Sequence, residues 1–114
     1  MKSKTLAEKA AWDYLNGLPE SEKFELVIIN PVLILGPSLI TGDFSSGQII
    51  TKLLSGKLPG MPKIMMSIVD FRDVAYAHLQ AIKIEDAKNK RFILSSDSVW
   101  FKDVAEVLRQ AYPR

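Results

Sequence analysis

Hydrophobic residues along this chain follow two spacings, which predict alternating helices and strands. Recurrence every three or four residues is typical of a helix with one buried face, and short uninterrupted apolar runs are typical of buried strands. The first spacing predicts helices over residues 3–17, over residues 45–54, from Asp70 or Asp73 through Ile82, and from Ser98 through Tyr112.

Glycine and serine predict where some of these helices begin and end. Gly17 suits a left-handed cap at the end of the first helix. Ser45 and Gln48 have the spacing of a capping box that opens the second helix, and Gly56 closes it. Residues that face the core are predicted for the later helices. They are Val74, Ala77, His78, Ala81 and Ile82 in the third helix, and Phe101, Val104, Ala105, Leu108 and Tyr112 in the fourth.

Three apolar runs are predicted to be strands. Residues 24–30, FELVIIN, show no polar alternation, which is typical of a parallel strand covered on both faces. Residues 68–71, IVDF, are short enough for an edge strand or a bridge, and residues 91–96, RFILSS, form the last predicted strand. The stretches VLILGPSLITGDFSSG and KLPGMPKIMMS are predicted to be loops.

This order of elements predicts an α/β fold, in which helices pack on a mostly parallel sheet. Two clear strands and one short strand are few for such a sheet. The backbone at an unpaired edge is a template for association with another chain. The sequence therefore predicts either a piece of something larger or self-association through an exposed sheet edge.

Composition and charge restrict the possible functions. The 114 residues are 47% hydrophobic and 25% charged, with a net charge of +2 and no block of like charge, so nucleic acid is not the expected partner. The apolar runs are far shorter than a membrane span needs, so no membrane is expected either and a cytoplasmic location is predicted. With no cysteine and one histidine, a disulfide or a metal site is not expected.

Three segments, in this order, resemble the C-terminal half of extended short-chain dehydrogenases. They are residues 2–14, KSKTLAEKAAWDY, residues 25–37, ELVIINPVLILGP, and residues 67–82, SIVDFRDVAYAHLQAI. Within that superfamily, which includes NAD-dependent epimerases and dehydratases, the likeness is to the dihydroflavonol reductase and cinnamoyl-CoA reductase group. It implies a partial Rossmann-like three-layer fold with few parallel strands and about four helices. It also implies reduction of a ketone or aldehyde to an alcohol with NADPH or NADH.

The resemblance implies a catalytic and cofactor-binding role for Lys4. In this family a Tyr-x-x-x-Lys pair begins a long helix, and the lysine lowers the pKa of the tyrosine and hydrogen-bonds the nicotinamide ribose. Lys4 matches the lysine, and the tyrosine would immediately precede Met1. Without the resemblance, the better explanation of Lys4 is a solvated lysine at a helix N-terminus that pairs loosely with Glu8 four residues later.

Other cofactor positions follow from the same resemblance. It places Pro31, Val32 and Leu33 beside the nicotinamide, and Ser46 at a cofactor phosphate. The alternatives are a proline that simply ends a strand and a serine that caps a helix.

Three further groups of residues have the chemistry for a functional or a structural role. Asp70, Arg72 and Asp73 are predicted to cap a helix and form ion pairs, and His78 is predicted to pack in the core rather than to act as a ligand or base. The methionines of the second loop suit an acyl or aromatic ligand but fill gaps equally well. They are Met61, Met65 and Met66.

The sequence thus predicts that residues 1–114 are the C-terminal part of an NAD(P)H-dependent oxidoreductase that acts on a small carbonyl substrate. The glycine-rich turn that seats the cofactor pyrophosphate belongs to the other half of such enzymes, and no G-x-x-G-x-x-G occurs here, so the chain is expected to be inactive alone. One alternative is a non-catalytic binding or regulatory fragment. Another is a related steroid or sugar-nucleotide dehydrogenase-isomerase. The carbonyl substrate and the choice between NADH and NADPH stay open.

Overall fold

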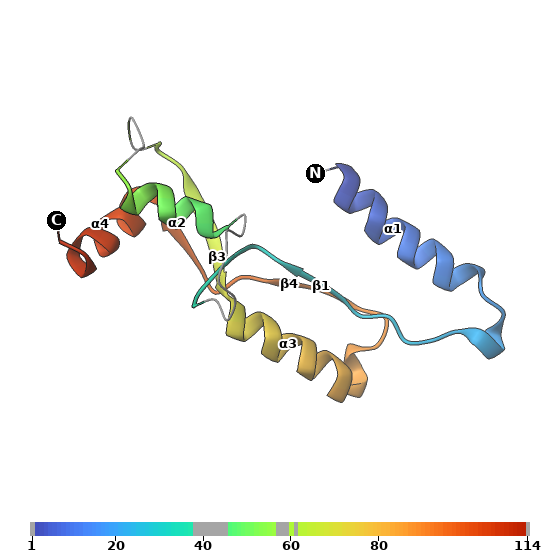
Figure 1. Cartoon of the computed structure of the whole chain (residues 1–114). Coiled ribbons are helices and arrows are strands. Elements are labelled where there is room, and N and C mark those ends of the chain that lie inside the picture. The colour runs from blue at the N-terminus through green and yellow to red at the C-terminus, as the bar shows by residue number, and fades with distance from the viewer. Residues whose placement is uncertain (1, 38–45, 57–59, 61, 114) are drawn as a thin grey trace.

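A two-stranded parallel sheet lies between two helices in one part of the molecule. The computed structural model describes residues 2–37, 46–56, 60 and 62–113. In it, β1 (Ile28–Pro31) pairs in parallel with β4 (Arg91–Leu94), with Ile29 opposite Phe92 and Asn30 opposite Ile93. Helix α1 (Lys2–Gly17) lies on one face of this sheet and α3 (Phe71–Lys83) on the other, which makes three layers (Figure 1).

A second, mixed sheet of three strands forms the other part. Its order is β2 (Leu33–Leu35), β3 (Met65–Asp70) and β5 (Asp97–Trp100), with β2 parallel to β3 and β5 antiparallel to it. Helices α2 (Gly47–Leu54) and α4 (Phe101–Ala111) pack on each other in this part of the molecule. Two short 3-10 helices complete the described elements, η1 (Glu20–Glu22) and η2 (Glu85–Ala87).

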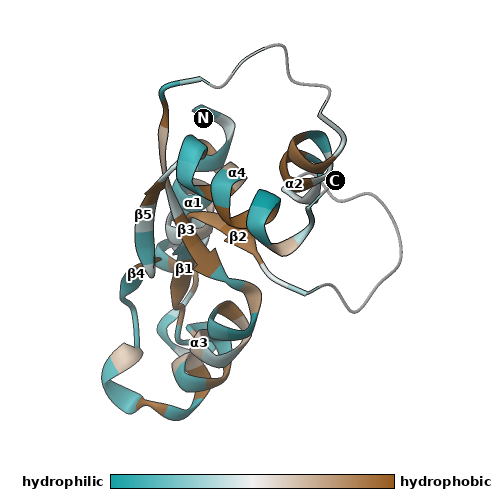
Figure 2. Cartoon of the chain, turned by 90° about the vertical axis from the view of Figure 1, so that its left-hand side faces the viewer, coloured by the Kyte–Doolittle hydropathy of each residue, from teal (hydrophilic) through white to brown (hydrophobic). Residues whose placement is uncertain are grey.

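The chain is elongated and encloses little core. Its radius of gyration is 18.2 Å, whereas a compact domain of this length has a radius of about 13 Å. Its accessible surface is 8921 Å², against about 6,300 Å² for a compact monomer of this mass. In the described part of the chain the buried apolar residues are Leu15, Val69, Ala87, Phe101 and Ala105. Hydrophobic residues on the strands and on the turns of α3 therefore remain in contact with solvent (Figure 2).

The α/β prediction is confirmed, but several strand boundaries were wrong. The first strand begins at Ile28 rather than at residue 24, because its ladder starts where β4 starts, with Ile28 N–H donating to Lys90 C=O. Residues 33–35, predicted as loop, form β2. Residues 68–70 of the IVDF run belong to β3, which is the central strand of its sheet and not an edge, and Phe71 begins α3. Met65 and Met66 lie on β3 and not in a loop, and Met61 lies outside the described residues.

Two predicted helix caps were also wrong. Ser98 does not cap the last helix, because residues 97–100 pair with β3, and the Ser98 hydroxyl lies 3.0 Å from that of Ser67. Gly17 ends α1 as expected but is not left-handed, whereas Gly56 has a φ of 65° as expected for a residue that closes α2. Ser45 lies outside the described residues.

The stripe predicted for α3 is only partly buried. Val74, Ala77 and Ala81 are half-buried against the sheet, whereas His78 is exposed and Ile82 is 85% exposed. The prediction of a core histidine was therefore wrong: His78 Nδ1 lies 2.7 Å from the Val74 carbonyl oxygen one turn earlier. In the last helix Phe101 and Ala105 are buried, Val104 and Leu108 are half-buried, and Tyr112, beyond its end, is exposed.

Candidate functional site

Lys4 lies in the first turn of α1 with an exposed side chain. That turn contains no acidic residue, so its ammonium group adds to the partial positive charge of the helix N-terminus. The loose pair with Glu8 considered above does not form, because Arg91 occupies the Glu8 carboxylate. None of the ion pairs between described residues includes Lys4. The ammonium group is therefore available to a ligand or to another part of a protein.

Glu8, one turn after Lys4, joins α1 to both strands of the two-stranded sheet. Its Oε1 accepts a hydrogen bond from Arg91 Nε at 2.7 Å, and its Oε2 accepts from Asn30 Nδ2 at 3.2 Å and from Arg91 Nη2 at 3.3 Å. The hydrogen bond from Arg91 is the largest cause of a lowered pKa of the Glu8 carboxyl, with Asn30 and Trp12 contributing in the same direction. Glu8 is therefore a carboxylate at neutral pH.

This attachment places Lys4 at a defined edge of the sheet. Helix α1 runs antiparallel to β1, with its N-terminus toward the end of β1 that leads into β2 (Figure 1). Because a helix rises 1.5 Å per residue, Lys4 lies about 6 Å beyond Glu8 in that direction. Glu8 contacts Asn30, and Pro31 follows it, so Lys4 and the end of β1 share the carboxyl edge of the parallel pair. In open parallel sheets this is the edge at which ligands bind.

The backbone at this edge is fixed. Pro31 is the last residue of β1, and the Val32 N–H donates to the Leu94 carbonyl oxygen at 3.0 Å. Leu33 then begins β2 and pairs with Ile68 of β3. Pro31, Val32 and Leu33 are all half-buried. A largely apolar strip with a fixed backbone therefore follows Asn30, the β1 residue to which Glu8 of α1 is hydrogen-bonded.

Ser46 lies in the other part of the molecule. It precedes α2, which packs on α4, and its side chain makes no capping hydrogen bond to the helix. The alternative of a helix-capping serine is therefore not supported by the geometry. The contact of Ser46 with a cofactor phosphate stays a prediction.

Asp70, at the end of β3, organises the start of α3. Its Oδ1 accepts the Arg72 backbone N–H at 2.8 Å and Arg72 Nε at 2.9 Å, while Oδ2 accepts Arg72 Nη2 at 2.7 Å. The predicted capping and ion pairing of Asp70 and Arg72 are confirmed. Asp73 lies in the first turn of α3, where it adds negative charge near Arg72. The geometry of these contacts therefore indicates a structural role for Asp70, Arg72 and Asp73.

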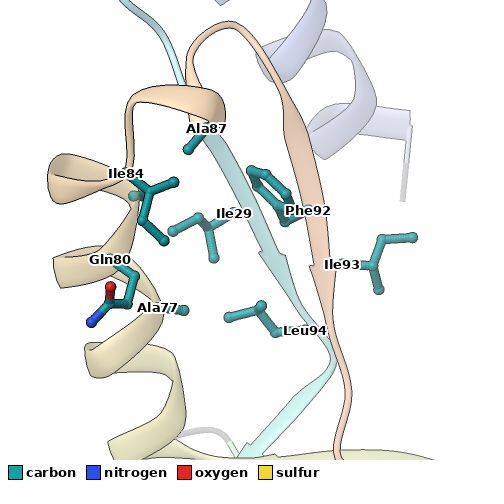
Figure 3. A pocket seen from close by; sticks show the side chains of 9 residues that line it. Ile29, Ala77, Gln80, Ile84, Ala87, Phe92, Ile93 and Leu94 are labelled. Atoms are coloured by element: carbon teal, nitrogen blue, oxygen red, sulfur yellow. The ribbon is translucent and has the colours of Figure 1, made fainter.

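An apolar cavity of about 220 Å³ lies between α3 and the two-stranded sheet (Figure 3). Its lining consists of Ile29, Ala77, Gln80, Ala81, Ile84, Ala87, Phe92, Ile93 and Leu94. Ile29 and Leu94 point toward α3, whereas Ile93 points to the opposite side of β4 (Figure 3). With Gln80 as its single polar lining residue, the cavity lacks the convergent polar groups of a catalytic pocket. It is a gap in the packing of the layers.

Sequence reasoning missed Asn30 and Arg91 as residues that orient α1. Glu8 is separated from Asn30 by 22 residues and from Arg91 by 83, so no local spacing indicates that they meet. The one available signal is a charged residue at the first position of a predicted strand. Within the described ranges, no cluster of three potential metal ligands occurs and no helix has the length and apolarity to cross a membrane.

Comparison with known proteins shows which class of protein this chain is similar to. No family model matches the chain. The NADPH-dependent methylglyoxal reductase of Saccharomyces cerevisiae is 33% identical over 97% of the chain, and cinnamoyl-CoA reductase 2 of Arabidopsis thaliana is 33% identical over 96%. The crystal structure of the yeast methylglyoxal/isovaleraldehyde reductase complexed with NADPH matches 98% of the chain with a TM-score of 0.86.

The chain is thus homologous to extended short-chain reductases, and the predicted resemblance and Rossmann-like fold class are confirmed. It corresponds to a C-terminal segment of them. The chain spans about one third of the length of the curated relatives it matches, 34% of the yeast enzyme and 32% of the plant enzyme.

Proposed function

We propose that residues 1–114 provide the C-terminal third of an NADPH-dependent carbonyl reductase, which converts a small ketone or aldehyde to an alcohol. Relatives that are a methylglyoxal reductase, a ketoreductase and a cinnamoyl-CoA reductase support this class of reaction. The observation that carries the proposal is the position of Lys4. Lys4 lies one helical turn before Glu8, which is hydrogen-bonded to Asn30, the residue before Pro31 at the carboxyl end of β1.

The residues at this edge fit a nicotinamide and its ribose. Lys4 is exposed, cationic and outside every ion pair formed by the described residues, so it is free to hydrogen-bond a ribose hydroxyl. Pro31 fixes φ, and the backbone from Val32 to Leu33 is held by two neighbouring strands, so a flat ring would meet an apolar surface that does not shift. Bound NADPH would supply the hydride for the carbonyl carbon.

The second proposed role of Lys4 is electrostatic. A tyrosine four residues before it would lie on the same side of the helix, because residues four apart are neighbours on a helix surface. The ammonium group favours the tyrosinate, so it lowers the tyrosine pKa from about 10 and makes it a better proton donor to the carbonyl oxygen near neutral pH.

The exposed surface supports the proposal that this chain packs against more protein. Its accessible area exceeds that of a compact monomer by about 2,600 Å², which is the scale of a large, permanent interface. The same observation favours the second candidate function, a non-catalytic fragment that binds a partner subunit. The two functions differ in whether Lys4 takes part in chemistry.

A covalent fusion tests the proposed function. The N-terminal two thirds of the yeast methylglyoxal reductase, ending in its tyrosine, is joined to Met1, and NADPH oxidation is followed with methylglyoxal. Fusion removes the association entropy that two separate fragments would have to overcome. We expect activity that Lys4→Ala reduces by about 100-fold, because an unassisted tyrosine is a weak acid at neutral pH.

Lys2→Ala is the matched control for the fusion. Lys2 is a cation on the same helical turn as Lys4, but it faces a different side of the helix because it lies two residues earlier. Its loss should therefore leave kcat within about twofold of the parent value. Equal activity of the Lys4→Ala and Lys2→Ala fusions would contradict the proposed role of Lys4. A soluble, folded fusion without activity would favour the binding fragment.

A further inference from the structure

One carboxylate on α1 is held by two strands at once. Glu8 accepts hydrogen bonds from Asn30 on β1 and from Arg91 on β4, and its side chain is 21% exposed. Most other ion pairs of the described residues join positions two or three apart, as in Arg109 with Glu106. The contact of Glu8 with Arg91 spans 83 residues and joins two layers of the fold.

We propose that Glu8, through Arg91 and Asn30, is a positioning residue for Lys4. It fixes how far α1 extends along β1, and therefore where the Lys4 ammonium group lies relative to Pro31. This inference rests on the proposed role of Lys4 and adds the device that holds it in place.

The apolar contacts of α1 do not fix its N-terminal turn. Leu15 is buried and Ala11 and Trp12 are half-buried, but all three follow Glu8 in the helix, whereas Leu6 is 54% exposed. An apolar contact also tolerates sliding, because it has no preferred direction. Hydrogen bonds from a planar guanidinium group to a carboxylate fix both distance and orientation. Glu8 is the attachment nearest to Lys4, so it limits movement at the end of the helix where precision is needed.

The chemistry of Glu8 favours positioning over proton transfer. Arg91 lowers the pKa of the Glu8 carboxyl, so it does not carry a proton to donate at neutral pH. Both of its oxygens are already occupied by donors from the sheet. The charged group that pairs with Glu8 is Arg91 on β4, and it favours the ionised form of the carboxyl.

The test uses Glu8→Gln, Arg91→Met and the double variant in the reductase fusion described above. Glu8→Gln should lower kcat by about tenfold, because small displacements of catalytic groups are costly, while KM for methylglyoxal changes little. The pH above which kcat/KM falls should move upward, since a displaced Lys4 no longer lowers the tyrosine pKa. The double variant should lose no more than the larger single loss, because both residues act through one contact.

Asp13→Asn is the matched control, since it removes a carboxylate from an exposed position on the same helix. Its kcat, pH profile and hydrogen exchange should equal those of the parent fusion. Hydrogen exchange of the α1 amides gives a readout that does not depend on activity, and Glu8→Gln should accelerate it relative to Asp13→Asn. A merely structural role would lower the yield of folded protein and leave the pH profile unmoved.

The outcomes separate the two proposals. An active fusion in which Glu8→Gln leaves the pH profile unchanged would overturn the inference about Glu8 and leave the role of Lys4 standing. An inactive parent fusion would overturn the proposed function. Hydrogen exchange of the α1 amides would then be the measurement that decides whether Glu8 holds α1 in place. Equal exchange in Glu8→Gln and Asp13→Asn would overturn the inference in either case.

Discussion

Both oxygens of the Asp70 carboxylate accept hydrogen bonds from Arg72. Oδ1 accepts from the backbone N–H and from Nε, and Oδ2 accepts from Nη2. The backbone bond caps α3, and the guanidinium bonds hold the carboxylate in the capping position. Side-chain and backbone hydrogen bonds from Arg72 lower the pKa of Asp70 to about 2. One acidic residue therefore ends β3 and begins the helix that covers the sheet.

The stabilising effect of Asp70 should depend on pH in a defined direction. Because its folded-state pKa of about 2 lies below the ordinary value of 3.8, its contribution is fully present above about pH 4 and is lost as the pH falls toward 2. Asp70→Asn should lower the urea midpoint of unfolding at pH 7, and the difference from the parent should shrink between pH 4 and pH 2. Asp73→Asn, which removes a charge from the same turn and leaves the cap, should cost less. A difference that stays constant down to pH 2 would contradict this account.

Gly36 is required by its close approach to the start of α3. Its φ is +139°, and a β-carbon at this position would lie 2.8 Å from Phe71 Cδ1 and 3.3 Å from Asp70 Oδ1. Gly36→Ala should therefore destabilise the fold by about 1–3 kcal/mol, measured by chemical unfolding.

Gly17→Ala is the control for that substitution. No atom lies within 4 Å of a β-carbon built there, and the residue ends α1 with an ordinary helical backbone, so stability should be unchanged or slightly higher. Equal changes in stability on the two substitutions would show that the close approach of Gly36 to Phe71 does not affect stability.

The sequence predicts local features of this chain well and pairings poorly. The helical spacing of α1 and the cap at Asp70 depend on residues within four positions, and both were found as predicted. Strand limits depend on the partner strand, so Ile28 starts β1 because Arg91 starts β4, 63 residues later. Ser98 has the residue type of a cap, but pairing with Ser67 across the sheet prevails.

The candidate site divides in the same way. The resemblance of residues 2–14 to a known family was enough to select Lys4, because that signal is a local motif. Asn30 and Arg91 could not be selected, since their role arises only when β1 and β4 bring them beneath Glu8. The burial expected for His78 and Ile82 failed because periodicity predicts a buried face only where another layer covers it.

The isolated chain should not bind NADPH measurably. The proposed site at Lys4 and Pro31 would contact only the nicotinamide end of the cofactor, and the 114 residues contain no glycine-rich turn to receive the pyrophosphate. Since a ligand raises the melting temperature only by binding the folded state, millimolar NADPH should leave that of the chain unchanged. The melting temperature of the active fusion should rise by several degrees at the same NADPH concentration. A comparable shift in the isolated chain would indicate a cofactor site within residues 1–114.

The isolated chain should also associate with itself, and β4 is where contact is expected. Strand β4 pairs only with β1 among the described strands, so its other edge is open, and Ile93 on it is 67% exposed. Light scattering after size exclusion should report a species larger than a monomer. Ile93→Glu should shift it toward the monomer, because a charge on an edge strand opposes pairing. Val107→Glu places the same charge at another β-branched aliphatic residue, which is 64% exposed on α4, and it should have no effect. A monomeric parent chain, or an equal response to both substitutions, would mean that the open edge of β4 is not the contact.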